Sequence, residues 1–315
     1  MTDTSASQDF PLGRALGFWF AVLKARTPGF IMIAVYAAAV TAVGQVLMGL
    51  LVLDPTIALL EDQTAPGEAP PAGLIGDLAA AVLLGIAVAM AAAALAESAW
   101  MRLFALGEVQ IRPGADELRM FVVLLAAYGG AIGLAMAVGV AASALGALLS
   151  GIGGAVLASL MAFIGFVGGL AASVWYGARV APAAALTVHD GRIALGDALR
   201  GTRPIFWGLL GALFVSVLIL IPGLFVSTLA QAAAPGPQIG ANAGGADAGA
   251  IAEAYRGYLA AISTPGGAAG AWAGVFIAQI VLTPFISVWR GIGARAALDI
   301  ADAGPDGGAP DEPGA

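Results

Sequence analysis

The longest hydrophobic stretch of the chain, Met120 to Ala178, contains 59 consecutive residues without a charged side chain. About 20 apolar residues suffice for one helix to cross a bilayer, so this stretch is long enough for two spans. The sequence Ser150 to Gly154 holds three glycines and is where we expect the turn. The pattern therefore predicts a transmembrane helical hairpin in the middle of the chain.

Further uncharged runs of similar length lie on both sides of this hairpin. Asp54-Pro55 is expected to end the first span, and Pro222 and Pro284 lie inside the last two. We predict an all-α polytopic integral membrane bundle of six transmembrane helices arranged as three helical hairpins. The expected spans are 31–53, 78–98, 120–149, 155–178, 205–230 and 268–289.

The segments outside the spans predict short amphipathic helices and two tails. From Leu12 to Arg26 apolar residues recur at helical spacing beside three basic residues, which favours an interfacial helix. A plain extension of the first span is the alternative, although Pro28-Gly29 favours a break. A second short helix is expected between Ile251 and Ile262. We expect residues 1–10 to form a disordered cytoplasmic tail, residues 11–300 a six-span membrane domain, and residues 301–315 a disordered acidic tail.

Composition agrees with a membrane protein. Hydrophobic residues make up 60% of the 315 residues and charged residues 10%, with a mean hydropathy of +0.93. Soluble domains carry about a quarter charged residues. The absence of cysteine excludes disulfides, thiolate metal sites and palmitoylation within this sequence.

The basic residues indicate the orientation. The six-span arrangement places twelve of the 13 basic residues on one side, and only Arg256 on the other. Because Lys and Arg are retained in cytoplasmic loops, we expect both termini in the cytoplasm. Tryptophans cluster at the same side, as expected for an interfacial aromatic belt: Trp19, Trp100, Trp175, Trp207 and Trp289.

Short patterns recur along the chain. Spans close with Ser98-Ala99-Trp100-Met101-Arg102, with Ser173-Val174-Trp175 before Arg179, and with Ser287-Val288-Trp289-Arg290, which suggests three hairpin repeats of one direction. Small residues four apart favour close helix packing, although a chain with 45 glycines also produces such spacings by chance. These pairs are Gly129 and Gly133, Ala135 and Gly139, and Gly165 and Gly169.

Motifs for catalysis are not found. The single histidine, His189, lies in a polar connection without Cys or His neighbours, which favours a solvated loop residue over a metal ligand. Gly291 to Ala296 fits a dinucleotide fingerprint but follows a membrane helix instead of a strand. We therefore expect no enzyme, metal or cofactor. If catalysis occurs, the acids to inspect are Glu97, Glu108, Asp116 and Glu117.

Three cytoplasmic patterns resemble a known group of proteins. Arg179-x-x-x-Ala-x-x-Leu-Thr, Leu195-Gly-x-Ala-Leu and Arg203-x-x-Phe-Trp are similar to those of uncharacterised bacterial six-helix membrane proteins. These proteins are in turn similar to the membrane domain attached to some glycerophosphoryl diester phosphodiesterases. The resemblance implies a multi-pass protein of the bacterial inner membrane, and no phosphodiesterase activity is carried over, because the catalytic barrel has no counterpart in this sequence.

The leading functional hypothesis is a non-enzymatic membrane protein with a cytoplasmic face that engages anionic lipid headgroups or a membrane or cytoplasmic protein partner. No nucleic-acid partner is expected. The alternative is a transporter or channel for a small, weakly polar solute, suggested by the two intramembrane prolines. The candidate face consists of Trp100, Arg102, Trp175, Arg179, Arg192, Arg200, Arg203, Trp289 and Arg290.

Overall fold

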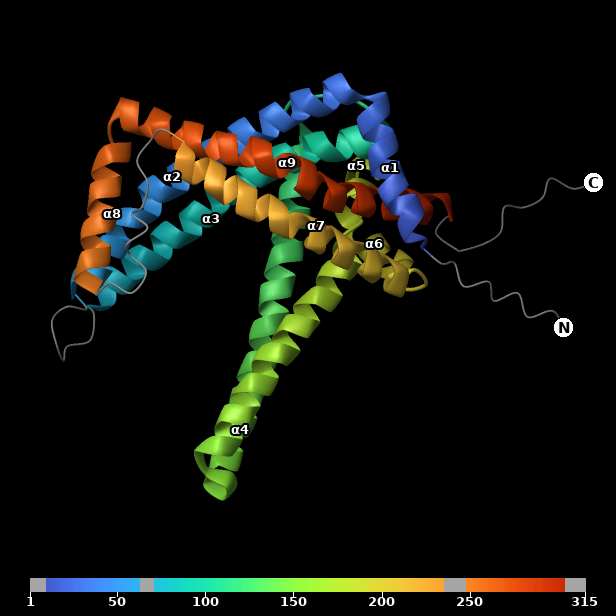
Figure 1. The fold of residues 1–315 in the computed structure, drawn as a ribbon. Coiled ribbons are helices and arrows are strands. Elements are labelled where there is room, and N and C mark those ends of the chain that lie inside the picture. The colour runs from blue at the N-terminus through green and yellow to red at the C-terminus, as the bar shows by residue number, and fades with distance from the viewer. Residues whose placement is uncertain (1–9, 63–70, 235–247, 304–315) are drawn as a thin grey trace, which may run out of the picture. The chain divides into compact units, whose positions relative to one another are not determined.

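The computed structural model describes residues 10–62, 71–234 and 248–303, apart from the side chains of residues 149–153, 155 and 248. Secondary structure in these ranges is helical, and no strand occurs within them, which confirms the expected all-α class. The elements are α1 (Leu12–Ala25), α2 (Thr27–Asp62), α3 (Ala72–Met101), the π-helical turn η1 (Arg102–Leu106), α4 (Ala115–Val180), α5 (Ala183–Asp190), α6 (Leu195–Gly201), α7 (Phe206–Ala233), α8 (Ala248–Ile262) and α9 (Pro265–Asp302) (Figure 1).

The two expected tails lie mostly outside the described residues, at 1–9 and 304–315. Their inner boundaries differ by a few residues from the expectation. Phe10 is buried, and α9 continues to Asp302.

Six helical segments are long and apolar enough to cross a membrane, as predicted. The chain is therefore a multi-pass membrane protein. The segments are longer than the apolar runs alone. At 1.5 Å per residue the 36 residues of α2 extend about 54 Å, against a hydrocarbon core of about 30 Å. The six are Thr27–Asp62, Ala72–Leu106, Ala115–Leu148, Val156–Asp190, Phe206–Ala233 and Pro265–Asp302.

The expectation that Asp54-Pro55 ends the first helix is wrong. Helix α2 continues through Pro55 to Asp62. Proline removes one backbone hydrogen bond of a helix, but the turn around it is supported by neighbouring contacts. The Thr56 hydroxyl donates to the Val52 carbonyl at 2.7 Å, and Leu53 and Ile57 on either side of the proline are buried. Burial of this apolar face outweighs the local cost of the proline.

The chain divides into two compact units, and α3, α7 and α9 contribute a segment to each. The basic unit comprises residues 1–25, 100–215 and 288–315. It contains every basic residue of the chain except Arg26 and Arg256. The bundle unit comprises residues 26–99 and 216–287, and it holds all of α2 and α8, most of α3, and parts of α7 and α9.

Helix α4 of the basic unit is the predicted hairpin. Gly154 adopts φ 63° and ψ −160° inside it, a conformation that L side chains rarely adopt, and the chain reverses there. Its two legs then run side by side (Figure 1). The Ser173 hydroxyl donates to the Ala131 carbonyl at 3.0 Å and the Tyr176 hydroxyl to the Ala126 carbonyl at 3.1 Å, which joins the legs by hydrogen bonds.

Small residues allow the two legs to pack closely. Only some of the small residues predicted from the sequence lie at this contact. A Cβ atom added at Gly165 would lie 2.7 Å from the Ala142 Cβ, and one at Gly169 would lie 3.1 Å from the Ala135 carbonyl oxygen. Gly129 and Gly133 have no atom within 4 Å of such a Cβ. The Gly165 and Gly169 pair is therefore a packing motif of the hairpin, whereas the Gly129 and Gly133 pair is not.

In the bundle unit α2 packs on three helices. A Cβ at Gly44 would lie 2.7 Å from the Ala92 Cβ of α3, and the Trp272 indole of α9 donates to the Ala39 carbonyl at 3.3 Å. Helix α8 lies beside the far half of α2 (Figure 1), with Ile262 in a buried cluster with Leu53. These contacts confirm the short helix predicted between Ile251 and Ile262.

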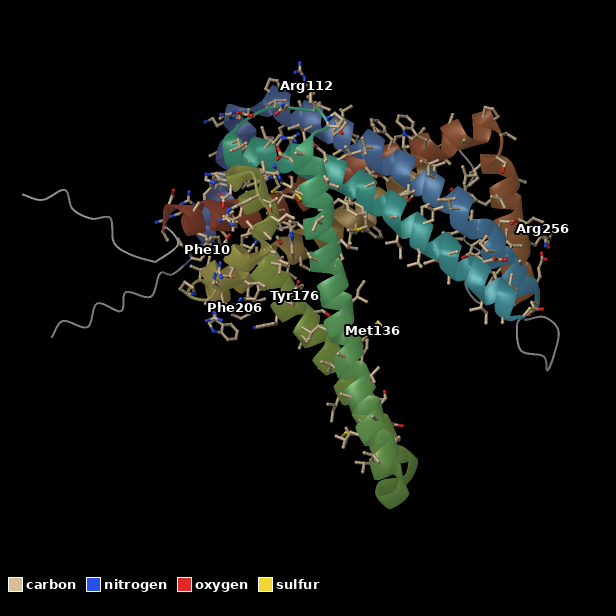
Figure 2. The ribbon with its side chains drawn as sticks, turned by 180° about the vertical axis from the view of Figure 1, so that it is seen from behind. Phe10, Arg112, Met136, Tyr176, Phe206 and Arg256 are labelled. Atoms are coloured by element: carbon tan, nitrogen blue, oxygen red, sulfur yellow. The ribbon has the colours of Figure 1, made fainter. Side chains whose placement is uncertain are left out.

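Arg256, the basic residue expected on the opposite side of the membrane, extends from α8 (Figure 2). It forms an ion pair with Glu61 of α2. The pair adds a polar link between the two helices beside their apolar contact.

The close approach at Gly165 predicts a selective effect of side-chain size. Replacing Gly165 with Leu should destabilise the protein by about 1–3 kcal/mol, because the new side chain overfills the space between the two legs. Replacing Gly133 with Leu should have little effect, since its surroundings are open. Unfolding in mixed SDS micelles measures both, and equal destabilisation by the two variants would contradict the hairpin packing.

Candidate functional site

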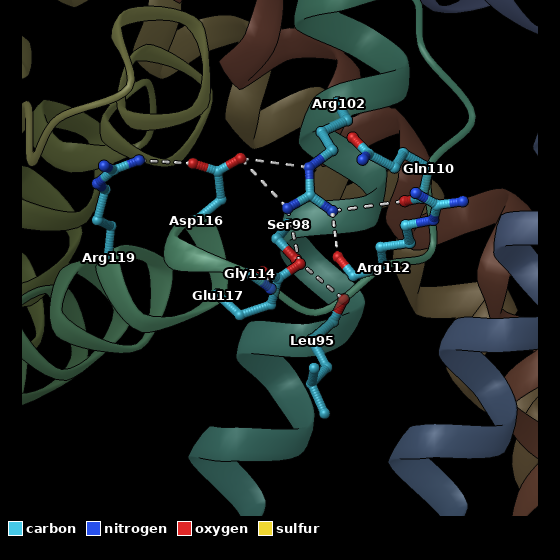
Figure 3. A network of polar contacts seen from close by, with 9 residues as sticks. All are labelled: Leu95, Ser98, Arg102, Gln110, Arg112, Gly114, Asp116, Glu117 and Arg119. Atoms are coloured by element: carbon cyan, nitrogen blue, oxygen red, sulfur yellow. Dashed lines mark hydrogen bonds and ion pairs between the residues drawn. The ribbon is translucent and has the colours of Figure 1, made fainter.

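Arg102 lies at the centre of a polar network in the basic unit (Figure 3). Its side chain is only 4% exposed, and its guanidinium forms ion pairs with Glu117 at 2.7 Å and with Asp116 at 3.2 Å. It also donates to the backbone carbonyls of Gln110 and Arg112, both at 3.5 Å. A buried guanidinium needs such partners, because an uncompensated charge is costly to remove from water.

The same network fixes the connection between α3 and α4. The Glu117 carboxylate accepts the Gly114 N–H at 2.5 Å at the start of α4, and Asp116 accepts Arg119 at 2.8 Å (Figure 3). Both acids lie in the first turn of α4, where the helix dipole favours negative charge. At the other end of the connection, Gly107 closes η1 in a left-handed conformation with φ 69°.

A column of aromatic rings continues from this network. The Arg290 guanidinium of α9 lies 5.5 Å from the Trp100 ring centre. Trp100 stacks on Phe104 with centroids 5.9 Å apart, and Phe104 lies 6.3 Å from Phe18 of α1. Cation–π and aromatic contacts of this kind join the end of α3 to α1 and α9 in the basic unit.

These contacts change the candidate face expected from the sequence. Trp100 and Arg102 are buried inside the basic unit, so they are not available to lipid headgroups. Trp289 and Arg290 are half-buried. The three Ser-x-Trp endings thus occupy different surroundings, since Trp175 is 47% exposed.

Arg192 and Arg200 are exposed but already hold a carboxylate. Asp197 pairs with Arg192 at 2.7 Å and with Arg200 at 2.6 Å. Hydrogen bonding to Arg200 and Arg192, with the charges of both, holds the pKa of Asp197 below its ordinary value. A lowered pKa means that this pairing stabilises the fold at neutral pH and loses that contribution as the pH falls through the acid range.

The Arg179 side chain contacts a backbone carbonyl and an aromatic ring. Its guanidinium donates to the Leu199 carbonyl and lies 5.4 Å from the Trp175 ring centre. The Arg179 carbonyl in turn accepts the Thr202 hydroxyl at 3.4 Å. Arg179 therefore ties the end of α4 to α6 and presents only part of its charge to the outside.

Four exposed cations of the basic unit remain without a carboxylate: among the described residues, no ion pair is found for Arg14, Lys24, Arg112 and Arg203. We call these four the basic surface. The side chain of Trp207, one turn beyond Arg203, is 80% exposed.

The residue before α1 lies next to the start of α7. Phe10 packs on Gly208, where an added Cβ would lie 2.7 Å from the Phe10 carbonyl oxygen, and Figure 2 shows Phe10 and Phe206 at the same end of the unit. Trp19 of α1 is buried, with its Cβ 3.0 Å from a Cβ placed at Gly291, whereas Phe20 is 62% exposed. Helix α1 is thus a separate helix, and it uses part of its apolar face on the protein.

Sequence reasoning placed only Arg203 of this basic surface in the candidate face. Arg14 and Lys24 were visible as the charges of an amphipathic helix. The sequence could not single out Arg112, because it does not show that Arg102 and Arg119 form the ion pairs with the nearby carboxylates.

The four acids considered for catalysis lie in different environments. Asp116 and Glu117 neutralise Arg102, Glu108 is exposed after η1, and Glu97 is half-buried on α3. His189 is exposed, with Nδ1 2.8 Å from a carboxylate oxygen of its neighbour Asp190. This arrangement supports charge pairing and offers no pair of acid and base around an open site within the described residues.

Comparison with known proteins adds no relative: the chain matches no family model, no curated protein and no solved structure.

The Arg102 network predicts a large difference between buried and exposed arginines. Replacing Arg102 with Gln should lower the free energy of unfolding by about 2–4 kcal/mol, because the ion pairs of Asp116 and Glu117 with a buried guanidinium are lost. Replacing Arg200 with Gln should cost less than about 1 kcal/mol, since its side chain is 76% exposed. SDS unfolding of the two variants is the measurement, and a loss for R102Q no larger than that for R200Q would contradict the structural role.

Proposed function

We propose that this chain is a non-enzymatic protein of the bacterial inner membrane whose basic surface engages anionic lipid headgroups. The observation that carries the proposal is a set of exposed cations that have no carboxylate partner within the described part of the chain, accompanied by the exposed rings of Phe20 and Trp207. Basic residues next to membrane helices attract anionic lipids by about 1 kcal/mol each near the surface. Aromatic rings prefer the same interfacial depth.

The proposed orientation has both termini in the cytoplasm, and two features support it. Basic residues gather in one unit, and cytoplasmic loops retain Lys and Arg. Arg26 and Arg256 belong to the bundle unit, and Arg256, the one basic residue expected on the opposite side of the membrane, has its charge matched by Glu61. The bacterial inner membrane itself is proposed from the resemblance of the cytoplasmic patterns.

Lipid is preferred to a protein partner because the cations stand beside membrane-spanning helices. Arg203 is three residues before α7, and Lys24 is three residues before α2. Charges at such positions lie within reach of the headgroup layer whether or not a partner is present. A protein partner would be indicated instead if binding depended on these cations and not on lipid charge.

Transport of a small solute is the second candidate. It would use the freed backbone carbonyls around Pro222 and Pro284. Next to these prolines, a Cβ at Gly223 would lie 2.4 Å from the Phe285 ring. Contact this close favours packing of α7 on α9 over a path between them, so we place transport second.

The proposed orientation predicts opposite labelling of two exposed glycines. The chain has no native cysteine, so Gly196→Cys on α6 and Gly257→Cys on α8 each create a single thiol. A membrane-impermeant maleimide applied to intact cells should label Gly257→Cys and should leave Gly196→Cys unlabelled until the cells are opened. Labelling of both, or the reverse pattern, would refute the orientation.

The proposed lipid binding predicts a strong dependence on three cations. In detergent, the triple variant R14Q/K24Q/R203Q should bind phosphatidylglycerol at least about tenfold more weakly than the parent chain, because three near-surface charges are lost. Tryptophan quenching by phosphatidylglycerol with brominated chains is the readout, with phosphatidylcholine as the neutral lipid. The control is R192Q/R200Q, whose arginines share Asp197. Equal weakening by both variants would argue against the basic surface.

A further inference from the structure

Two pairs of an arginine and a tryptophan lie at the ends of consecutive spans of the basic unit. Trp175 lies one helical turn before Arg179, where the apolar run of the fourth span ends. Trp207 lies one turn after Arg203, where the fifth span begins. In both pairs the tryptophan is on the side of the apolar run and the arginine on the side of the connection. This order is typical of a membrane interface, where aromatic rings and cations meet the lipid headgroups.

Contacts between described residues hold the two arginines near each other. The Thr202 hydroxyl donates to the Arg179 carbonyl at 3.4 Å, and Arg203 is the next residue of the chain. The Arg179 guanidinium also donates to the Leu199 carbonyl, three residues before Thr202. Because neighbouring Cα atoms are only about 3.8 Å apart, both long side chains can reach one small anion beside Thr202.

Arg179 has no carboxylate partner and keeps one donor unused. Among the described residues its guanidinium contacts the Leu199 carbonyl and the Trp175 ring, whose centre lies 5.4 Å away, and it forms no ion pair there. Its Nε is buried, and no hydrogen-bond partner for it is found in the same part of the chain. A buried donor without an acceptor is unfavourable. An anion that accepts from Nε would relieve this cost and neutralise the charge.

The surroundings of the two arginines suit a lipid phosphate. A guanidinium presents its N–H donors as a planar fork that matches the oxygens of a phosphate group. Both tryptophan rings are exposed, Trp175 to 47% and Trp207 to 80%. Rings of this kind favour the interfacial depth of a lipid, whereas a free phosphate ion would gain nothing from them. The ligand is therefore expected to carry acyl chains as well as a phosphate.

We propose that Arg179 and Arg203 together hold the phosphate group of one anionic lipid. The rings of Trp175 and Trp207 then lie against the start of its acyl chains. Because Nε of Arg179 is covered in the structure, binding includes a turn of this side chain away from the Trp175 ring, after which Nε–H and a terminal N–H donate to the phosphate. The site rests on the proposed function and deepens it, since it gives one anionic lipid a defined position on the protein.

The first experiment is a double-mutant cycle on phosphatidylglycerol binding in detergent. R179K keeps the charge but loses the planar fork, and R203Q removes the charge. Each should weaken binding roughly fivefold. R179K/R203Q should weaken it by less than the product of the two factors, because both arginines hold the same phosphate. The matched pair R14Q and R203Q should give the full product. A full product for R179K/R203Q, or unchanged binding by R179K, would overturn the shared site.

The second experiment locates the lipid and decides the question even if R179K fails to fold. Phosphatidylglycerol with brominated chains should quench the parent chain more than brominated phosphatidylcholine does, and W175F/W207F should remove most of this excess. W272F is the control, since its indole donates to the Ala39 carbonyl in the bundle unit. An excess that survives W175F/W207F would refute the site. Inorganic phosphate should leave the quenching unchanged, and its displacement of the lipid would show that the free anion is the ligand.

The two experiments separate this site from the proposed function. If phosphatidylglycerol binds the parent chain no better than phosphatidylcholine, the proposed function fails and the site fails with it. If phosphatidylglycerol binds better and R14Q/K24Q/R203Q weakens its binding, while R179K and W175F/W207F change nothing, only the site fails.

Discussion

Burial of the Arg102 guanidinium is the constraint around which the basic unit is organised. A charged group removed from water needs opposite charge and hydrogen-bond acceptors at once, and here two carboxylates and two backbone carbonyls provide them (Figure 3). Because both acids lie in the first turn of α4, the pairing fixes where the hairpin begins. The guanidinium of Arg290 lies over the neighbouring Trp100 ring, which joins α9 to the same core.

Because several arginines form contacts within the protein, fewer cations are exposed and unpaired among the described residues than the sequence implies. Of the arginines on the expected cytoplasmic side, Arg102 is buried, Arg179 binds a backbone carbonyl, and Arg192 and Arg200 share Asp197. What remains exposed is the basic surface at the ends of α1 and α7 and in the connection before α4. The proposed lipid binding would act on these remaining cations.

The membrane architecture could be predicted because it depends on composition over long windows. Uncharged runs of about 20 residues leave few alternatives to spanning helices, and the glycines near residue 150 marked the turn that Gly154 makes. The end of the first helix could not be predicted, since Pro55 is tolerated where Leu53 and Ile57 are buried. That packing involves residues far apart in the chain, and a local signal does not report it.

The candidate site was harder for a similar reason. A sequence shows the sign of each charge, and it does not show which charges neutralise one another. The same holds for small residues: Gly165 and Gly133 belong to equivalent spacings, yet only the first lies between two helices. Residue type thus predicted that charged residues form ion pairs and that small residues allow close helix packing. Which of these residues do so depends on the three-dimensional structure.

The central claim is that the basic surface gathers anionic lipid, and the lipid shell of the protein in its native membrane tests it most directly. Extraction into polymer-bounded nanodiscs, followed by lipid mass spectrometry, gives the ratio of anionic to zwitterionic lipid around the chain. We predict a ratio above that of the bulk membrane, which falls to the bulk value in R14Q/K24Q/R203Q. A ratio equal to the bulk value around the parent chain would contradict the account.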